Sequence, residues 1–129
     1  MHDQNLAILK GLVCVAWADG AMHATERQLL EALLQAFNAK PSEALEIRLF
    51  AEQPRTLQDV PIHDLSYADR RMLLTQAVIL SFADGEQHST EQVIIKDLAR
   101  ELRIPDIEAR GIIAAAEEQA RQSLELLAK

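Results

Sequence analysis

Two short segments of the sequence carry the same residue types at the same spacing. Ala-Asp-Gly-Ala-Met-His-Ala-Thr-Glu at 18–26, the first copy, recurs 65 residues later as Ala-Asp-Gly-Glu-Gln-His-Ser-Thr-Glu at 83–91, the second copy, and six of the nine positions are identical. Carboxylates and imidazoles bind divalent metals or act as general acids and bases. The residues shared by both copies that could do this chemistry are Asp19, His23, Glu26, Asp84, His88 and Glu91.

The two aspartates are the residues most in need of an explanation. Asp19 and Asp84 each follow an apolar helical segment, and the carbonyl dipoles at the end of a helix disfavour a negative charge. A bound cation would compensate. Carboxylate oxygens from Asp19 and Glu26, or from Asp84 and Glu91, suit calcium or manganese, and imidazole ligands would shift the preference toward zinc. A divalent-metal site at each copy is therefore one interpretation of these residues.

Each position also has a structural interpretation. Gly20 and Gly85 can adopt the left-handed conformation that ends a helix and reverses the chain. The aspartates can accept hydrogen bonds from their own turns, and the glutamates fall in the first turn of the next helix, where the dipole favours them. The spacing is not that of an EF-hand, because Gly directly follows Asp. Both interpretations, metal sites and purely structural acidic turns, stay open at this point.

A third hypothesis is a hydrolase that uses the paired carboxylates and histidines as acid, base and metal ligands. It requires the two copies to meet in space as one shared site. The sequence shows no nucleophile with a base at a recognisable spacing and no Gly-rich phosphate loop. We therefore expect no enzyme activity and no organic cofactor.

The elements that position these copies are helices. Apolar residues recur at helical spacing over 6–18 and 29–37, and Lys40-Pro41-Ser42 opens a third helix through about Glu52, with Leu45, Leu49 and Phe50 on its apolar side. Residues 53–65 form an ordered connector. Further helices are predicted at 66–83, nearly all apolar from Met72 to Phe82, at 89–103, and from Pro105 to about Leu127.

This pattern predicts an all-α fold, a compact bundle of six to seven helices in a single domain over 1–129. Each copy lies between an apolar and an amphipathic helix, so we expect two pseudo-symmetric helical hairpins that arose by duplication. Gly111 marks a break or a close-packing point in the last helix. Its apolar stripe packs within the molecule or mediates a dimer, so the chain is a monomer or a weak dimer; the stripe comprises Ile112, Ile113, Ala116, Leu124 and Leu127.

Composition excludes several partners. The 129 residues include 20 Asp plus Glu against 13 Lys plus Arg, for a net charge of -7, which disfavours nucleic acid. No apolar run reaches the roughly 20 residues of a membrane span. Residues 6–18 resemble a signal-peptide core, but Asp3 and Lys10 are wrong for export, so we expect a buried first helix and a cytoplasmic protein. The single Cys14 is expected to be a core residue.

Two Ala-Asp-Gly turns, each followed by Glu six residues after the Gly in a helical chain of this size, resemble the tellurite-resistance TerB family. The same domain also occurs at the N-terminus of a DnaJ-like co-chaperone. The resemblance covers nearly the whole chain. It implies a compact helical fold without catalytic activity that binds divalent metal and takes part in stress responses, with Asp19, Glu26, Asp84 and Glu91 at the matching positions.

The sequence departs from the family pattern at three points. His23 and His88 stand where the family has Ser, Thr or Asp, and Gln87 replaces a usual aliphatic residue, so the two sites need not be equivalent. No His-Pro-Asp is present, so chaperone recruitment through a J-domain is not expected. The resulting hypothesis is a non-enzymatic stress-related sensor or scaffold with an unidentified protein partner. The alternative is a helical protein-protein interaction module without metal.

Overall fold

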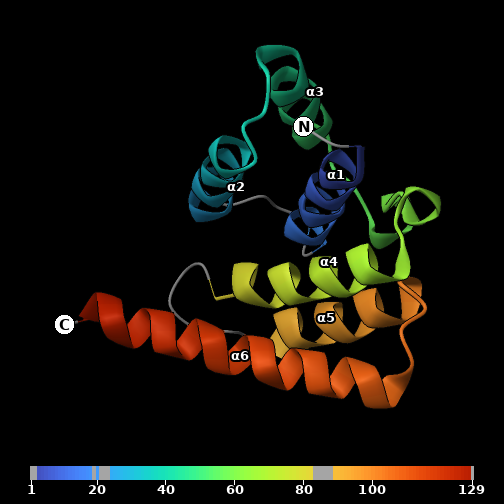
Figure 1. Ribbon diagram of the computed structural model, residues 1–129, viewed down its shortest axis with the longest axis vertical. Coiled ribbons are helices and arrows are strands. Elements are labelled where there is room, and N and C mark those ends of the chain that lie inside the picture. Colours follow the sequence, from blue (N-terminus) through green and yellow to red (C-terminus); the bar gives the residue numbers. More distant parts are fainter. Residues whose placement is uncertain (1–2, 19, 21–23, 83–88, 129) are drawn as a thin grey trace.

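The computed structural model describes residues 3–18, 20, 24–82 and 89–128, with the side chains of all of these except 3–4, 25, 89–90 and 123–128 (Figure 1). The described residues form six α-helices and two 3₁₀-helices and no strand, which confirms the all-α prediction. In chain order the elements are α1 (Asp3–Trp17), α2 (Ala24–Ala36), α3 (Pro41–Ala51), η1 (Leu57–Asp59), η2 (Ile62–Asp64), α4 (Tyr67–Leu80), α5 (Ser89–Glu101) and α6 (Asp106–Ala128).

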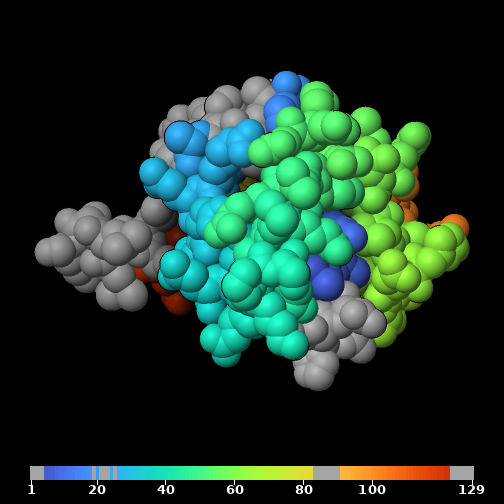
Figure 2. Space-filling model, turned by 90° about the horizontal axis from the view of Figure 1, so that it is seen from above, coloured from blue at the N-terminus to red at the C-terminus, as the bar shows by residue number. Residues whose placement is uncertain are grey.

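Helices α1 and α4 form the centre of the molecule. Helix α1 contacts α2, α3, α5 and both 3₁₀-helices, and α4 contacts α1, α5 and α6. Figure 2 shows how α2, α3 and the ordered connector between α3 and α4 cover α1, of which only small patches remain visible from that side. These neighbours explain why most residues of α1 are apolar, as its sequence predicts.

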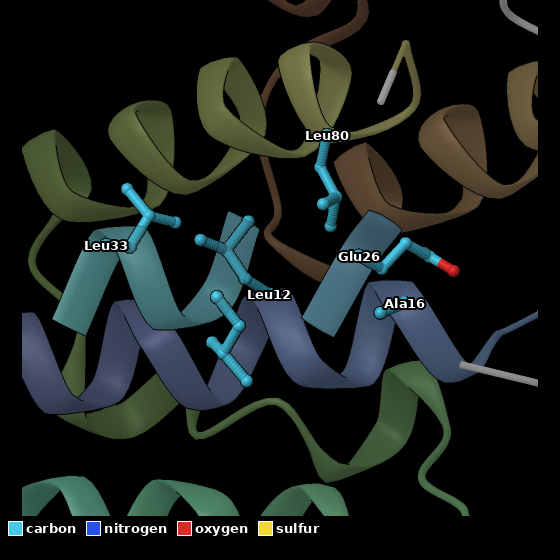
Figure 3. A pocket seen from close by; sticks show the side chains of 6 residues that line it. Leu12, Ala16, Glu26, Leu33 and Leu80 are labelled. Atoms are coloured by element: carbon cyan, nitrogen blue, oxygen red, sulfur yellow. The ribbon is translucent and has the colours of Figure 1, made fainter. Parts of the chain in front are cut away.

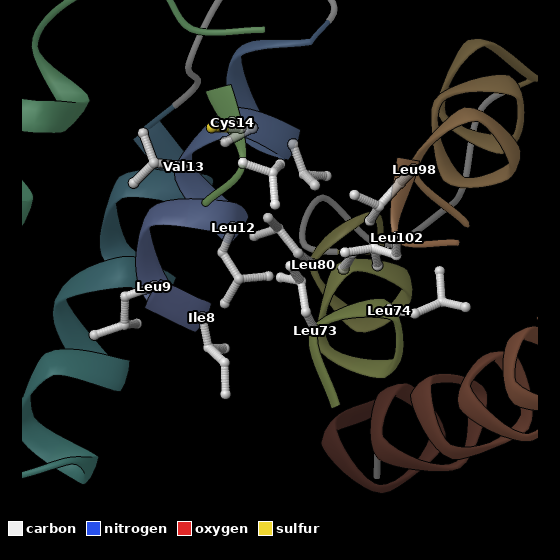
Figure 4. Packing of buried hydrophobic residues seen from close by; sticks show 14 of the residues in the cluster. Ile8, Leu9, Leu12, Val13, Cys14, Leu73, Leu74, Leu80, Leu98 and Leu102 are labelled. Atoms are coloured by element: carbon white, nitrogen blue, oxygen red, sulfur yellow. The ribbon is translucent and has the colours of Figure 1, made fainter. Parts of the chain in front are cut away.

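The core is continuous across all the helices. The side chains of α1 and α4 interdigitate, and Leu98 of α5 and Leu102 just after it pack against α4 (Figure 4). The largest fully buried side chains are Leu9, Val13, Cys14, Ile47, Leu73, Leu74, Val78, Leu98 and Leu102. The prediction that Cys14 is a core residue is confirmed.

The 65-residue repeat extends well beyond the two copies. Helices α2 and α5 begin and end 65 residues apart, and so do the starts of α3 and α6. Asn38 and Arg103, also 65 residues apart, end α2 and α5 in the left-handed conformation at φ 54° and 56°. The same backbone hydrogen bonds close both turns, from the amide of Ala39 to the Leu34 carbonyl (3.0 Å) and from Ile104 to Ala99 (3.1 Å). Pseudo-symmetry of the halves in space stays a prediction.

The first half of the chain contains α1–α3 and the second half contains α4–α6, and the two differ in where their third helices, α3 and α6, end. Helix α3 has 11 residues, whereas α6 has 23. The indole Nε1 of Trp17 donates a hydrogen bond to the carbonyl of Ala51, the last residue of α3, at 2.8 Å. Phe82 stands at the position equivalent to Trp17 and carries no donor, and α6 continues past Ala116, the equivalent of Ala51. The indole satisfies a carbonyl that has no partner within the helix, and so allows α3 to end there.

Three expectations about individual helix positions are wrong. Leu45 and Leu49 are 54% and 53% exposed, because α3 packs through the narrower face of Ala44, Ile47 and Ala51, whose two alanines allow a close approach to α1. Phe50 is half-buried as expected.

Met72, at the start of the apolar run in α4, is 50% exposed, so the burial of α4 begins at Leu73. Gly111 does not break α6, and a Cβ built on it would meet no atom within 4 Å, so it is not a close-packing point within the chain. Ile112, Ile113 and Ala116 do pack on the core, as the stripe predicts, whereas the side chains of Leu124 and Leu127 lie outside the described residues.

Candidate functional site

The first copy begins at the end of α1, and its start is described. The amide of Ala18 donates to the Val15 carbonyl at 3.1 Å, and the amide of Gly20 donates to the Trp17 carbonyl at 2.8 Å. Gly20 has φ +94°, a conformation that residues with a side chain rarely adopt. The prediction that Gly20 provides a left-handed helix end is therefore confirmed.

The predicted ligands are only partly within the described residues. Glu26 and Glu91 lie in the first turns of α2 and α5, as predicted, and both side chains are half-buried. Asp19, His23, Asp84 and His88 lie outside the described residues, as does Gly85. The described residues include no group of three or more His, Cys, Asp or Glu side chains that could hold a metal ion. That observation therefore does not test four of the six predicted ligands, which lie outside the described residues.

A small apolar cavity lies between Glu26 of the first copy and the end of α4, the helix that precedes the second copy. It has a volume of about 10 Å³, close to the minimum that holds one water molecule. Its lining residues come from α1, α2 and α4 and are Leu12, Ala16, Glu26, Leu30, Leu33 and Leu80 (Figure 3). The carboxylate of Glu26 points away from Leu12 and Leu33 in this view. Leu80 is the last residue of α4, so the glutamate of the first copy lies beside the helix end that precedes the second copy.

A larger hollow lies elsewhere, between α4 and α6. This groove, hereafter the α4–α6 groove, has a volume of about 340 Å³. Its lining residues are Arg71, Thr75, Ile107, Glu108, Gly111, Ile112, Ala115, Ala116 and Gln119.

One end of the groove is polar. The carboxylate of Glu108 accepts hydrogen bonds from the hydroxyl of Tyr67 and from Nη1 of Arg71, the latter at 3.0 Å. The hydrogen bond to Glu108 raises the pKa of the Tyr67 hydroxyl above its usual value. These three side chains join the start of α4 to the first turns of α6 and close one end of the groove.

Sequence reasoning missed this groove, although a signal for it is present. Ile107, Gly111 and Ala115 are spaced four residues apart and therefore share one face of α6. A large apolar residue followed by two small ones on one face is typical of a surface that another element can approach closely.

Comparison with models of known families, with curated proteins and with solved structures finds no match to this chain. Within its described residues, the chain has no helix whose length and apolar character would let it traverse a bilayer.

Proposed function

We propose that the chain is a non-enzymatic TerB-like domain that binds divalent metal at its two repeated acidic turns and serves as a stress-response sensor or scaffold. The observation that carries the proposal is the position of the two copies. Each follows a central helix and enters an equivalent outer helix, α2 or α5, whose bounds repeat at the same 65-residue offset. Equivalent junctions with the same carboxylates support a common chemistry at both.

The described part of the first copy fits this role. Gly20 takes a left-handed conformation just after α1, and Glu26 lies in the first turn of α2, so Asp19 and Glu26 flank one short connection in the sequence. The net charge of -7 favours the approach of cations over that of anions. Asp19 and Glu26 in the first copy, and Asp84 and Glu91 in the second, are the proposed ligands, with His23 and His88 as additional donors if the ion is zinc.

Titration of the chelator-stripped protein with calcium, manganese and zinc tests the proposal. We expect saturable heat in calorimetry and a rise in melting temperature, because an ion that binds only the folded chain adds about 2.7 kcal/mol at one hundred times its Kd. Trp17 is the only tryptophan and precedes the first copy, so its fluorescence reports the first site, whereas calorimetry reports both.

Paired variants provide the control. Asp19→Asn combined with Asp84→Asn should abolish both signals and leave the helical content unchanged. Asp64→Asn combined with Asp106→Asn removes the same charge from exposed positions outside the copies and should preserve metal binding. Equal melting shifts in the Asp19/Asp84 variant and the parent would contradict the proposal.

The alternative function is a helical protein-protein interaction module whose acidic turns are purely structural. It is favoured by the hydrogen bond from Gly20 to the Trp17 carbonyl, which accounts for that turn without a ligand, and by several exposed large apolar side chains on the helices. Under this alternative, partner capture by the tagged protein is unchanged by a chelator, whereas the metal proposal requires capture to fall.

A further inference from the structure

The repeat allows the α4–α6 groove to be compared with its counterpart in the first half, between α1 and α3. There the ring of Phe50 occupies the position equivalent to Ala115. The guanidinium of Arg55 lies over that ring at 3.9 Å from its centroid, and Nζ of Lys10 lies at 5.8 Å. Lys10 also pairs with Glu46 at 3.0 Å. The first half thus fills this place with its own aromatic ring and covers it with charged side chains.

The second half has smaller residues at each of these positions. Ala115 replaces Phe50, Gly111 replaces Glu46 and Thr75 replaces Lys10. A Cβ at Gly111 would meet nothing within 4 Å, and within the described chain no large side chain takes the place of the missing ring. By the 65-residue offset, the α4–α6 groove therefore lies at positions whose first-half equivalents carry larger side chains.

A large apolar side chain stands unburied at the edge of this groove. Ile107 is 84% exposed, the highest value among the described large hydrophobic residues. It lies two helical turns before Ala115 on the same face of α6, with Gly111 midway between them. If two α6 helices cross antiparallel with Gly111 at the crossing point, Ile107 of each copy lies opposite Ala115 of the other. This arrangement is self-complementary, as a two-fold interface must be.

The charges around the groove favour a second copy over a partner of opposite charge. The chain as a whole carries -7, and two copies would repel each other across most of their surface. At the groove, however, Arg71 pairs with Glu108 at 3.0 Å and Arg110 with Asp106 at 2.8 Å, so these four charges cancel. A basic partner would be drawn to the acidic surfaces instead. This face is one on which two acidic chains can meet without like-charge contacts.

We propose that the α4–α6 groove is the self-association surface of this protein, in which Ile107 of each copy fills the groove over Gly111 and Ala115 of the other. The absent side chain at position 111 allows the two helices to approach closely at their crossing. One helix crossing buries less surface than a standard stable interface, so the dimer is weak and depends on concentration. The proposal is independent of metal binding at the two turns.

Sedimentation equilibrium of the full chain from micromolar to millimolar concentration tests the proposal. We expect the parent to form dimers as concentration rises and Ile107→Glu to stay monomeric, with association at least tenfold weaker, because the dimer would bury an unpaired charge. Val93→Glu is the matched control: Val93 is 58% exposed on α5, away from the groove, and its variant should dimerise like the parent. Circular dichroism checks that both variants keep the parent's helical content.

A second pair of variants tests the groove itself. Ala115→Phe introduces the residue found at the equivalent position 50, so it should fill the groove, abolish dimerisation and leave the monomer folded with unchanged or higher stability. Gly111→Cys should yield a disulfide-linked dimer under mild oxidation, because the crossing brings these positions within disulfide reach, whereas Val93→Cys should not. The single native Cys14 is fully buried and does not compete.

Two results would overturn the proposal. One is a parent that stays monomeric over the whole concentration range, even if the groove then takes up a hydrophobic peptide from another protein. The other is a parent dimer that persists unchanged in both Ile107→Glu and Ala115→Phe, since the copies would then meet on a different face.

Discussion

At the scale of single residues, the thiol of Cys14 shows how strongly the core differs from water. Its side chain has no exposed surface, and desolvation by burial, with a smaller contribution from the charge of Asp59, raises its pKa from 9.0 to about 12. The neutral thiol is therefore the stable form in the folded chain at all ordinary pH values. A buried neutral thiol is not a nucleophile, which agrees with the absence of any chemical role predicted for it.

This pKa predicts a pH dependence of stability. Between pH 9.0 and about 12 the unfolded chain has lost the thiol proton that the folded chain keeps. Because the folded state then binds more protons, the free energy of unfolding falls as pH rises, by up to ~1.4 kcal/mol per pH unit from this group. Urea denaturation of the parent and of Cys14→Ala at several pH values across this range measures the difference. Identical pH slopes in the two proteins would show that the thiol titrates normally in the folded state.

At the scale of elements, the different lengths of α3 and α6 follow from Pro54, which cannot continue a helix and has Gln119 as its counterpart, and from a hydrogen bond to the last carbonyl of α3. The Trp17 indole supplies the donor for the buried Ala51 carbonyl, and Phe82 in the other half cannot. We predict that Trp17→Phe lowers the free energy of unfolding by about 1–3 kcal/mol, since a buried carbonyl loses its partner and the smaller phenyl ring leaves part of the indole's volume unfilled. Urea denaturation followed by circular dichroism gives the value.

A matched control for this variant is Thr75→Val. The Thr75 hydroxyl donates to the Arg71 carbonyl at 3.2 Å, but that carbonyl lies within α4, where the helix itself supplies a partner. Thr75→Val should therefore change stability by no more than ~0.5 kcal/mol. Equal losses in the two variants would mean that the indole hydrogen bond adds nothing to the stability of this helix end.

The sequence predicts which segments are helical, but it does not predict which face of some helices is buried. Apolar periodicity and the proline-rich connector place all six α-helices, because these signals are local. Helix α3 has two apolar faces. The face of Ala44, Ile47 and Ala51 is buried, whereas Leu45 and Leu49 are exposed. The choice depends on how closely α1 approaches, which the sequence of α3 alone does not determine.

At the scale of the whole molecule, nine residues were enough to detect the repeat in the sequence. The structural features that recur at the same 65-residue offset could not be predicted from those residues. The left-handed turns at Asn38 and Arg103 involve different residue types, and the larger side chains of Lys10, Glu46 and Phe50 have Thr75, Gly111 and Ala115 as counterparts, so these repeated positions become apparent only once the helix bounds are known. The candidate metal ligands were identified by residue identity alone. Of these, Glu26 and Glu91 lie in the first helical turns where the sequence predicted them.

The contact between α1 and α4 joins the two halves, and the helices approach closely at Gly11. A Cβ at Gly11 would lie 2.5 Å from Cδ2 and 3.0 Å from Cδ1 of Leu73, a side chain with no exposed surface and therefore little room to move. We predict that Gly11→Ala destabilises the parent by about 1 kcal/mol or more, because overpacking outweighs the better helix propensity of alanine.

In a Leu73→Ala background, which itself costs about 2–5 kcal/mol, the same Gly11→Ala change should instead stabilise the chain by about 1 kcal/mol. The clashing methyl groups are gone there, and the new methyl fills part of the space they leave. Urea denaturation of the four proteins in a double-mutant cycle measures this reversal of sign. Gly111→Ala is the control: nothing lies within 4 Å of its Cβ position, so it should stabilise the monomer in both backgrounds. A Gly11→Ala effect of the same sign in both backgrounds would mean that α1 and α4 can separate at this point without cost, and that the two halves are held together elsewhere in the core.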